Sequence, residues 1–367
     1  MLWLAVVAFF SAALVSLLVL RWARRRNFFY DEQSPQKFHV GEIPRLGGIG
    51  LLCGILISWL LGMVSSLFLG DPAILRMGDW VGLWCVALLP AVVGGVAEDL
   101  TQRLSVRYRL FLTMSTALLA VAWVGLSVPR LGLFWVDDWM VSMPWIGLVL
   151  AVLAITGLPH AFNIIDGYNG LAAMVAIIIC LALTHVALQV GDRALAALLV
   201  STAAATAGFL IWNYPRGLIF AGDGGAYLWG VVIAFASIAL VQRHPQVSPW
   251  FPMLLLIYPV WETVFSMYRK WARGVSPGVA DALHFHQLIY RRIVRGVFDD
   301  DDEARDMLMR NNRTSPYLWA FTLLTVVPAV LFWSNTLVLM LCCALFVVLY
   351  AIAYMAIVRF KLPSWLQ

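Results

Sequence analysis

The chain has 367 residues, of which 62% are hydrophobic and only 12% are charged, with a formal net charge of +5. A soluble domain has about 25% charged residues and roughly 45–50% apolar ones, so this composition excludes an ordinary soluble protein. Helices and closed barrels are the two structures that satisfy their backbone hydrogen bonds in lipid, and the apolar runs here are too long for barrel strands. We therefore expect an all-α integral membrane protein.

Apolar runs of the length that crosses a bilayer, about 17 to 25 residues, recur along the whole chain. We predict a polytopic bundle of about eleven transmembrane helices, and we interpret residues 1–367 as a single transmembrane catalytic domain with a polar loop at about 269–316. The runs centre on Leu2 to Leu20, Leu46 to Leu69, Trp80 to Ala97, Leu110 to Leu126, Met143 to Pro159, Leu171 to Val190, Leu195 to Trp212, Ala226 to Val241, Trp250 to Met267, Leu318 to Trp333 and Thr336 to Val358.

Charge around these runs predicts the orientation. The first run has no positive charge before it and four arginines directly after it, the reverse of a cleavable secretory signal. If spans alternate from an external amino terminus, all but four of the 25 Lys and Arg lie on the Arg21 side; the exceptions are Arg76, Arg130, Arg193 and Arg243. The positive-inside rule thus predicts an external N-terminus and a cytoplasmic C-terminus. A positive face of this kind suits membrane orientation and anionic ligands, and it gives no indication of nucleic acid.

Polar motifs follow in chain order at the predicted cytoplasmic ends of the spans. The loop from Phe28 to Gly50 contains Lys37 and His39. A lysine in this place either binds a phosphate at the membrane surface or is part of a basic juxtamembrane loop, and both interpretations stay open.

The third span ends in two adjacent acids, Glu98 and Asp99. Adjacent carboxylates repel each other and commonly mark a cation or a proton acceptor, but they also occur in solvated loops where arginines pair with them. Arg107 follows, and because a guanidinium does not deprotonate, its chemical role would be that of an anion clamp.

The stretch from Gly157 to Leu171, GLPHAFNIIDGYNGL, ends a long apolar run in polar residues. Asn163, Asp166 and Asn169 stand three residues apart, so on a helix end they project to roughly one side. The neighbouring glycines allow the backbone to approach a ligand closely. An ionisable group at the edge of an apolar segment is a candidate functional group, although a polar loop that caps a membrane helix is the alternative.

Asp223 lies in a glycine-rich turn, AGDGG, at the start of another span. A carboxylate on such a turn can reach a hard cation such as magnesium, which takes one or two carboxylates together with waters and phosphate oxygens. The topology brings this turn to the same membrane face as the acids above. The sequence therefore predicts one acidic site at the cytoplasmic end of the bundle.

The large polar loop adds His284 and His286, followed by Arg291 and Arg292. Two histidines two residues apart with no third His or Cys nearby do not indicate zinc, so we interpret them as ligands of a diphosphate. Glu262 lies inside the ninth predicted span, where we expect a structural role for it, paired with a base near Arg269.

Five motifs together resemble the polyprenyl-phosphate N-acetylhexosamine-1-phosphate transferases, which include the phospho-MurNAc-pentapeptide transferases and the GlcNAc-1-phosphate transferases. The motifs are PQKFHVGEIPRLGG, the acidic pair before SVRYR, NIIDGYNGL, NYPRGLIFAGDGG and HFH, in the family's order. HFHQLIYRR is closer to the branch that serves O-antigen and related glycans.

The resemblance implies transfer of a sugar-1-phosphate, of the GlcNAc type or a deoxy derivative, from a UDP-N-acetylhexosamine to undecaprenyl phosphate with release of UMP. It further implies magnesium, or else manganese, as the cofactor, and a site on the cytoplasmic side of a bacterial inner membrane. A homodimer is left open. The implied roles are metal binding by Asn163 and Asp223, an approach to the nucleotide by Asp166 and Asn169, contacts to diphosphate or sugar by His284 and His286, and seating of the lipid phosphate by Lys37, His39 and Arg107.

Two alternatives remain at this stage. The family usually has paired aspartates in place of Glu98 and Asp99, so it is open which of them acts as a base and whether a base is needed, since a phosphate monoester ionises near pH 6. A transporter is the rival function, because acids in a bundle with many spans often bind protons or ions. That rival predicts acids near the bilayer midplane and inverted repeats, and neither is visible in the sequence.

Overall fold

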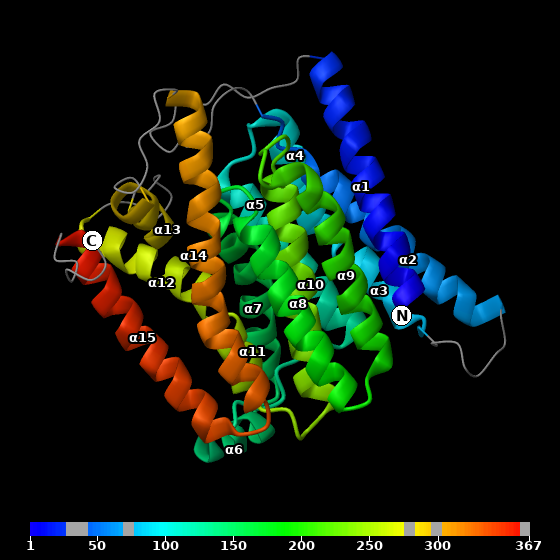
Figure 1. The fold of residues 1–367 in the computed structure, drawn as a ribbon. Coiled ribbons are helices and arrows are strands. Elements are labelled where there is room, and N and C mark those ends of the chain that lie inside the picture. Colours follow the sequence, from blue (N-terminus) through cyan, green and yellow to red (C-terminus); the bar gives the residue numbers. More distant parts are fainter. Residues whose placement is uncertain (27–42, 69–76, 275–282, 295–302, 360–367) are drawn as a thin grey trace.

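The protein is described by a computed structural model at residues 1–26, 43–68, 77–274, 283–294 and 303–359, and every regular element in these ranges is a helix. The predicted all-α class is thus confirmed, and Figure 1 shows the arrangement. The helices are α1 (Leu2–Arg25), α2 (Gly47–Phe68), α3 (Trp80–Ala87), α4 (Leu89–Thr101), α5 (Val106–Leu119), η1 (Ala120–Val124), α6 (Phe134–Ser142), α7 (Trp145–Ile165), α8 (Leu171–Gln189), α9 (Arg193–Asn213), α10 (Gly222–Arg243), α11 (Trp250–Leu255), α12 (Ile257–Ala272), α13 (Phe285–Ile289), η2 (Tyr290–Val294), α14 (Glu303–Leu331) and α15 (Thr336–Val358).

Nine helical segments in the described part of the chain are long and apolar enough to cross a membrane, so the predicted count of eleven is not confirmed. The apolar run at 110–126 forms α5 and then changes to the π-helix η1. The run at 250–267 is broken at Leu256, between α11 and α12. Pro259 accounts for this break, because a proline has no N–H to donate to the carbonyl four residues earlier.

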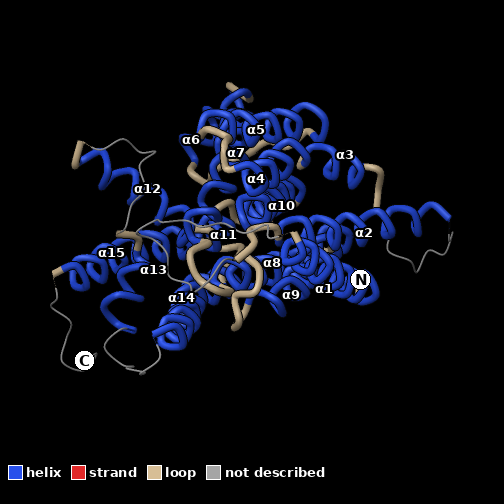
Figure 2. The backbone as a smooth tube through the Cα atoms, turned by 90° about the horizontal axis from the view of Figure 1, so that it is seen from above, coloured by secondary structure: helices blue, strands red, loops and turns tan. Residues whose placement is uncertain are grey.

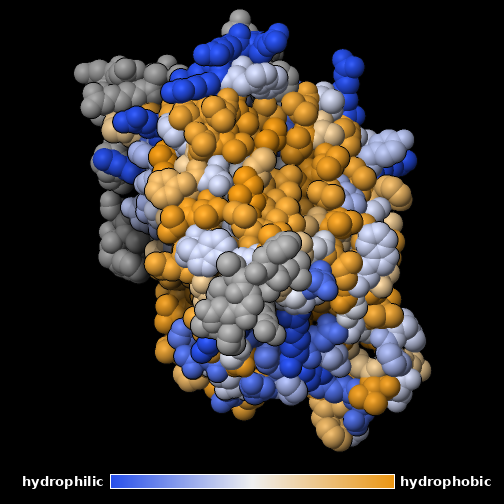
Figure 3. All heavy atoms as spheres, turned by 90° about the vertical axis from the view of Figure 1, so that its right-hand side faces the viewer, coloured by the Kyte–Doolittle hydropathy of each residue, from blue (hydrophilic) through white to orange (hydrophobic). Residues whose placement is uncertain are grey.

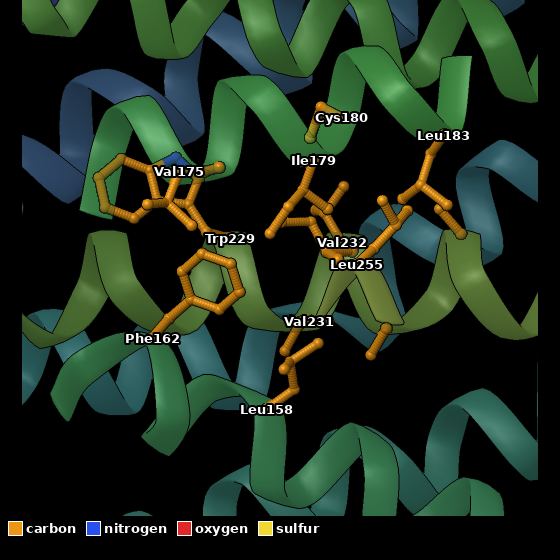
Figure 4. Close-up of a cluster of buried hydrophobic side chains, with 14 of the residues drawn as sticks. Leu158, Phe162, Val175, Ile179, Cys180, Leu183, Trp229, Val231, Val232 and Leu255 are labelled. Atoms are coloured by element: carbon orange, nitrogen blue, oxygen red, sulfur yellow. The ribbon is translucent and has the colours of Figure 1, made fainter. Parts of the chain in front are cut away.

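Helix α10 is the centre of the bundle. Its most apolar 18-residue window is buried along its full length. It packs against α7, α4, α2 and α8, and Figure 2 shows it enclosed by these helices. Figure 4 shows how Phe162 of α7 and Val175 of α8 meet Trp229 of α10 in the hydrophobic core. The two ends of α10 are therefore held in fixed positions by the surrounding helices.

Glycines allow three helix backbones to meet at the first turn of α10. A Cβ atom added at Gly48 of α2 would lie 2.4 Å from the backbone nitrogen of Gly225, and one added at Gly95 of α4 would lie 2.6 Å from that of Gly224. Helix association in lipid depends on such close packing, because apolar contact with lipid is as favourable as contact with another apolar helix. These contacts place the ends of α2 and α4 directly against Asp223.

The surface agrees with a multi-pass membrane protein. Figure 3 shows hydrophobic residues in a broad band, with hydrophilic residues gathered toward the two ends of the molecule. Helix α12 extends sideways from the bundle in Figure 2 and is amphipathic. Its exposed residues include Val264, Met267 and Trp271, whereas Glu262 and Ser266 are buried.

Candidate active site

The candidate site is built around Asp223, in the first turn of α10. The Oδ1 atom of Asp223 accepts a hydrogen bond of 2.7 Å from the Nδ2 atom of Asn163, at the end of α7. Its Oδ2 atom forms an ion pair of 2.6 Å with Arg109 of α5, and the two side chains are 15% and 22% exposed. Asn163 and Asp223, 60 residues apart in the sequence, are thus in direct contact, and the carboxylate still reaches the surface.

Asp99 caps the amino end of α10. Its two carboxylate oxygens accept hydrogen bonds of 2.8 Å each from the backbone N–H groups of Asp223 and Gly224. The first helical N–H groups have no partner within the helix, and the helix dipole favours a negative charge at this end. Asp99 therefore fixes the backbone that carries Asp223.

Gly222 makes this cap possible, because it has a φ of +69° and a Cβ atom there would lie 2.4 Å from both carboxylate oxygens of Asp99. We expect Gly222→Ala to destabilise the protein by about 2–5 kcal/mol, from overpacking and from a left-handed backbone. Thermal unfolding in detergent would measure this. Gly191→Ala is the matched control, since Gly191 has a φ of +80° but no neighbour within 4 Å. Equal losses in the two variants would contradict the role of the contact with Asp99.

The two acids predicted as a pair point to different partners. Glu98 accepts a hydrogen bond of 2.8 Å from the backbone nitrogen of Leu104 and so holds the turn after α4. Asp99 turns toward α10, as described above. Each carboxylate is therefore held by its own backbone donors.

Arg109 and Arg45 lie close to the site, although neither was predicted to belong to it. Arg107, the predicted anion clamp, is exposed on α5, whereas Arg109 contacts Asp223. Thr113, four residues after Arg109, lies 3.2 Å from the Nε2 atom of His160. Arg109 and Thr113 stand four residues apart and so share one face of α5, but the sequence does not show that this face is turned toward α7 and α10. Two further predicted ligands, Lys37 and His39, lie outside the described residues.

Asp166 directly follows α7 and faces the same cluster. Burial raises the pKa of its carboxyl group to about 7, the nearby charge of Arg45 lowers the pKa, and the like charge of Asp223 raises it. Arg45 is the second basic residue near the site that was not predicted. It belongs to a segment that pairs with the chain before Asp223: the backbone nitrogen of Gly47 donates to the carbonyl of Phe220, and that of Phe220 donates to the carbonyl of Pro44. A cation or a positively charged side chain that approached Asp166 would favour its ionised form.

The raised pKa of Asp166 gives a pH dependence for the metal-free protein. The ordinary pKa is 3.8 and the folded value is about 7, so the stabilising contribution is complete below about pH 4 and is lost as the pH rises through 7. Asp166→Asn has no such ionisation. We expect the melting temperature of the variant, relative to the unaltered protein, to increase between pH 5 and pH 8 in chelator. Parallel pH curves for the two proteins would contradict this.

Asn169 is 1% exposed and binds the chain that forms α14. Its backbone nitrogen donates to Asn311, its side-chain nitrogen donates to Asn312, and its carbonyl accepts from Ser315. The side chain therefore joins the DGYNG turn to α14, and the predicted contact with a nucleotide remains a prediction. Its Oδ1 atom is buried without a hydrogen-bond partner among the described residues.

The histidine motif meets the DGYNG turn from the other side. The rings of His284 and His286 are parallel, with centroids 5.4 Å apart, and His286 lies edge-on to Tyr168 at 5.6 Å. Burial lowers the pKa of His286 to about 3, and His284 and Arg269 lower it further against the opposing charge of Glu262. His286 is therefore neutral at neutral pH. The basic partner of Glu262 is His284, whose Nδ1 atom lies 2.9 Å from the carboxylate.

The oxygen ligands at Asp223 fit a hard cation. Magnesium takes one or two carboxylates together with waters and substrate phosphates, and Asp223 with the Asn163 amide supplies such a partial set. Within the described ranges, no group of three His, Cys, Asp or Glu side chains gathers to hold a metal. The residues present therefore fit a cation that shares its coordination with a bound substrate.

Comparison with known proteins shows which kind of enzyme this chain is similar to. Residues 80–241 match the model of glycosyl transferase family 4. The chain is 26% identical to the probable undecaprenyl-phosphate N-acetylglucosaminyl 1-phosphate transferase of Bacillus subtilis, over 77% of this chain and 76% of the relative. It is 25% identical to the undecaprenyl-phosphate alpha-N-acetylglucosaminyl 1-phosphate transferase of Thermotoga maritima, over 79% of this chain and 81% of the relative.

A third relative has a different sugar in its name. The phospho-N-acetylmuramoyl-pentapeptide-transferase of Moorella thermoacetica is 28% identical, over 65% of this chain and 76% of the relative. All three are sugar-phosphate transferases by name, which favours the transferase interpretation over the transporter. The match over residues 80–241 and the three relatives support the family that the five motifs predict, and they identify the chain as a sugar-phosphate transferase.

Proposed function

We propose that the protein transfers an N-acetylhexosamine-1-phosphate, of the GlcNAc type or a deoxy derivative, from a UDP-sugar to undecaprenyl phosphate, and so initiates a lipid-linked surface glycan such as O-antigen. The observation that carries the proposal is the cluster of Asp223, Asn163 and Arg109 at one end of the bundle. The names of the relatives support the lipid acceptor and the GlcNAc-type sugar. The positive-inside pattern supports a cytoplasmic site in a bacterial inner membrane.

The chemistry is an in-line displacement. An oxygen of the lipid phosphate attacks the phosphorus that bears the sugar, the bond from this phosphorus to the bridging oxygen breaks, and UMP leaves with that oxygen. Phosphoryl transfer depends mainly on positioning and charge neutralisation, with little covalent work for the protein. No covalent intermediate on the enzyme is required, because both substrates meet at the membrane surface.

The residues of the cluster have separate tasks in this reaction. Asp223 and Asn163 would hold magnesium, which when bound would offset the charge of the diphosphate and stabilise the leaving UMP. Arg109 and Arg45 supply positive charge beside Asp223 and Asp166, where the phosphate oxygens would lie. Asp99 keeps the first turn of α10 in place and does not need to accept a proton, since a phosphate monoester is largely ionised at neutral pH.

UMP release is the test. Purified protein with undecaprenyl phosphate would be given UDP-GlcNAc, UDP-GalNAc, a UDP-6-deoxy-N-acetylhexosamine or UDP-MurNAc-pentapeptide, each with magnesium, with manganese or with excess chelator. We expect metal-dependent release with one or two of the simple N-acetylhexosamines and none with the MurNAc donor. Release without undecaprenyl phosphate, or none with any donor from folded protein, would refute the proposal.

A further inference from the structure

Glu262 is a buried acid at the base of the histidine motif. It lies on α12 and is 0% exposed. Its Oε1 atom accepts hydrogen bonds from the Nδ1 atom of His284 at 2.9 Å and from the backbone nitrogen of Phe285 at 3.2 Å. Its Oε2 atom accepts a bond of 2.6 Å from the hydroxyl group of Tyr350 on α15. Three donors on one carboxylate stabilise its charged form, so Glu262 ties three helical elements together as an anion.

This contact decides which nitrogen of His284 faces outward. A carboxylate only accepts hydrogen bonds, so the Nδ1 atom of His284 must carry a hydrogen. The Nε2 atom lies at the opposite edge of the ring and is the nitrogen left for a ligand. The side chain of His284 is 11% exposed whereas that of Glu262 is fully buried, so a ligand would meet the histidine and not the acid.

The histidine pair connects Glu262 to the rest of the site. His284 stacks on His286, and a Cβ atom added at Gly167 would lie 3.0 Å from the Nε2 atom of His286. Gly167 follows Asp166, whose pKa responds to both Arg45 and Asp223. The contacts therefore lead from the buried carboxylate of α12 through the two histidines to Gly167, the residue after Asp166.

We propose that Glu262 is a positioning residue for the transfer reaction: it fixes the tautomer and ring orientation of His284, so that the unprotonated Nε2 atom accepts a hydrogen bond from a hydroxyl or amide group of the UDP-sugar. The inference rests on the proposed function of the site. Because Glu262 is fully buried, it acts through the imidazole and does not touch the substrate. A small misplacement of a catalytic group can cost about 10²-fold in rate, and this is the scale we expect.

A double-mutant cycle separates this role from a structural one. Glu262→Leu has a side chain of similar size, but it accepts no hydrogen bond from His284. We expect Glu262→Leu and His284→Ala each to lower kcat by about 10²-fold, with an unchanged KM for undecaprenyl phosphate. The double variant should be no slower than His284→Ala, since Glu262 acts only through that ring. Multiplied losses in the double variant would overturn the proposal.

A pair of tyrosine variants adds a milder test. Tyr350→Phe removes one donor from Glu262 but leaves the bond to His284 in place. We expect a loss in kcat of less than tenfold. Tyr268→Phe is the matched control on the exposed face of α12 and should leave kcat unchanged. A larger loss for Tyr268→Phe than for Tyr350→Phe would count against the proposal.

Nuclear magnetic resonance of nitrogen gives a readout that needs no catalysis and no Glu262 variant. The chain has six histidines. In a sample labelled with ¹⁵N-histidine, the signals of His284 are identified as those lost in His284→Ala. In proteoliposomes without substrate, we expect the Nδ1 atom of His284 to carry hydrogen. A bare Nδ1 atom would overturn the inference even if the enzyme is active. If no UDP-sugar releases UMP, the proposed function fails, and this spectrum still decides the orientation of His284.

Discussion

Replacement of Asp223 by asparagine is expected to lower UMP release by about 10³-fold or more. Both oxygens of this carboxylate are engaged, one by Asn163 and one by Arg109. The asparagine has nearly the same shape, but it lacks the charge that would hold magnesium and that balances Arg109. A lost metal contact removes several kcal/mol of transition-state stabilisation, and each 1.36 kcal/mol corresponds to a factor of ten in rate. Initial rates of UMP release at saturating magnesium would measure the loss.

Calorimetric titration with magnesium in the presence of UMP gives a second readout for Asp223→Asn, and we expect the binding heat to disappear. Asp138→Asn is the control, since Asp138 lies on α6, which Figure 1 shows at the lower end of the molecule, away from α4. This control should leave both the rate and the binding heat unchanged. A variant at Asp223 that keeps more than about a tenth of the rate would show that the carboxylate does not hold the essential metal.

The apolar runs predicted the positions of the spans well because length and hydrophobicity decide whether a segment crosses a bilayer. They failed where a helix is interrupted inside an apolar run. Pro259 breaks the run at 250–267 at Leu256, and the following α12 leaves the bundle sideways. Hydropathy does not register such a break, because the residues on both sides are equally apolar. The proline was the available signal.

The meeting of Asn163 and Asp223 could be predicted because both residues stand at the ends of apolar runs that the topology brings to one face. Which arginine contacts Asp223 could not be predicted, because this depends on the rotation of α5 about its axis. In the structure, Arg109 is the arginine of α5 that contacts Asp223, whereas Arg107 is exposed. The metal-binding and substrate-binding roles of these residues remain predictions.

The partners of Glu262 could not be predicted from the sequence for another reason. His284 lies 22 residues later, at the start of α13, and Tyr350 comes from the last helix. A buried acid must find partners, but the sequence does not say which of several bases it meets. Arg269 was the nearest base in the chain, yet its guanidinium lies over the rings of Phe265 and Tyr354. Tertiary packing decided the pairing.

Replacement of Asp99 by asparagine is the second large effect that we expect, and it should reduce both stability and activity. An asparagine has one side-chain oxygen, so one of the two N–H groups of Asp223 and Gly224 would face an amide nitrogen. A buried donor without a partner costs about 1–3 kcal/mol. Because the same backbone carries the Asp223 carboxylate, we expect UMP release to fall by about 10²-fold.

Measuring both the melting temperature and the transfer rate of Asp99→Asn distinguishes a helix-capping role of Asp99 from a role as proton acceptor. If Asp99 were a base, Asp99→Asn would slow transfer but leave the melting temperature nearly unchanged, whereas a cap predicts that both fall. Glu98→Gln is the matched comparison, since Glu98 is the neighbouring acid and has a single backbone donor, at Leu104. It should lose less stability and less activity than Asp99→Asn. A strong loss of rate in Glu98→Gln with an unchanged melting temperature would assign proton transfer to Glu98. Asp99 would then keep its role as the residue that holds the first turn of α10.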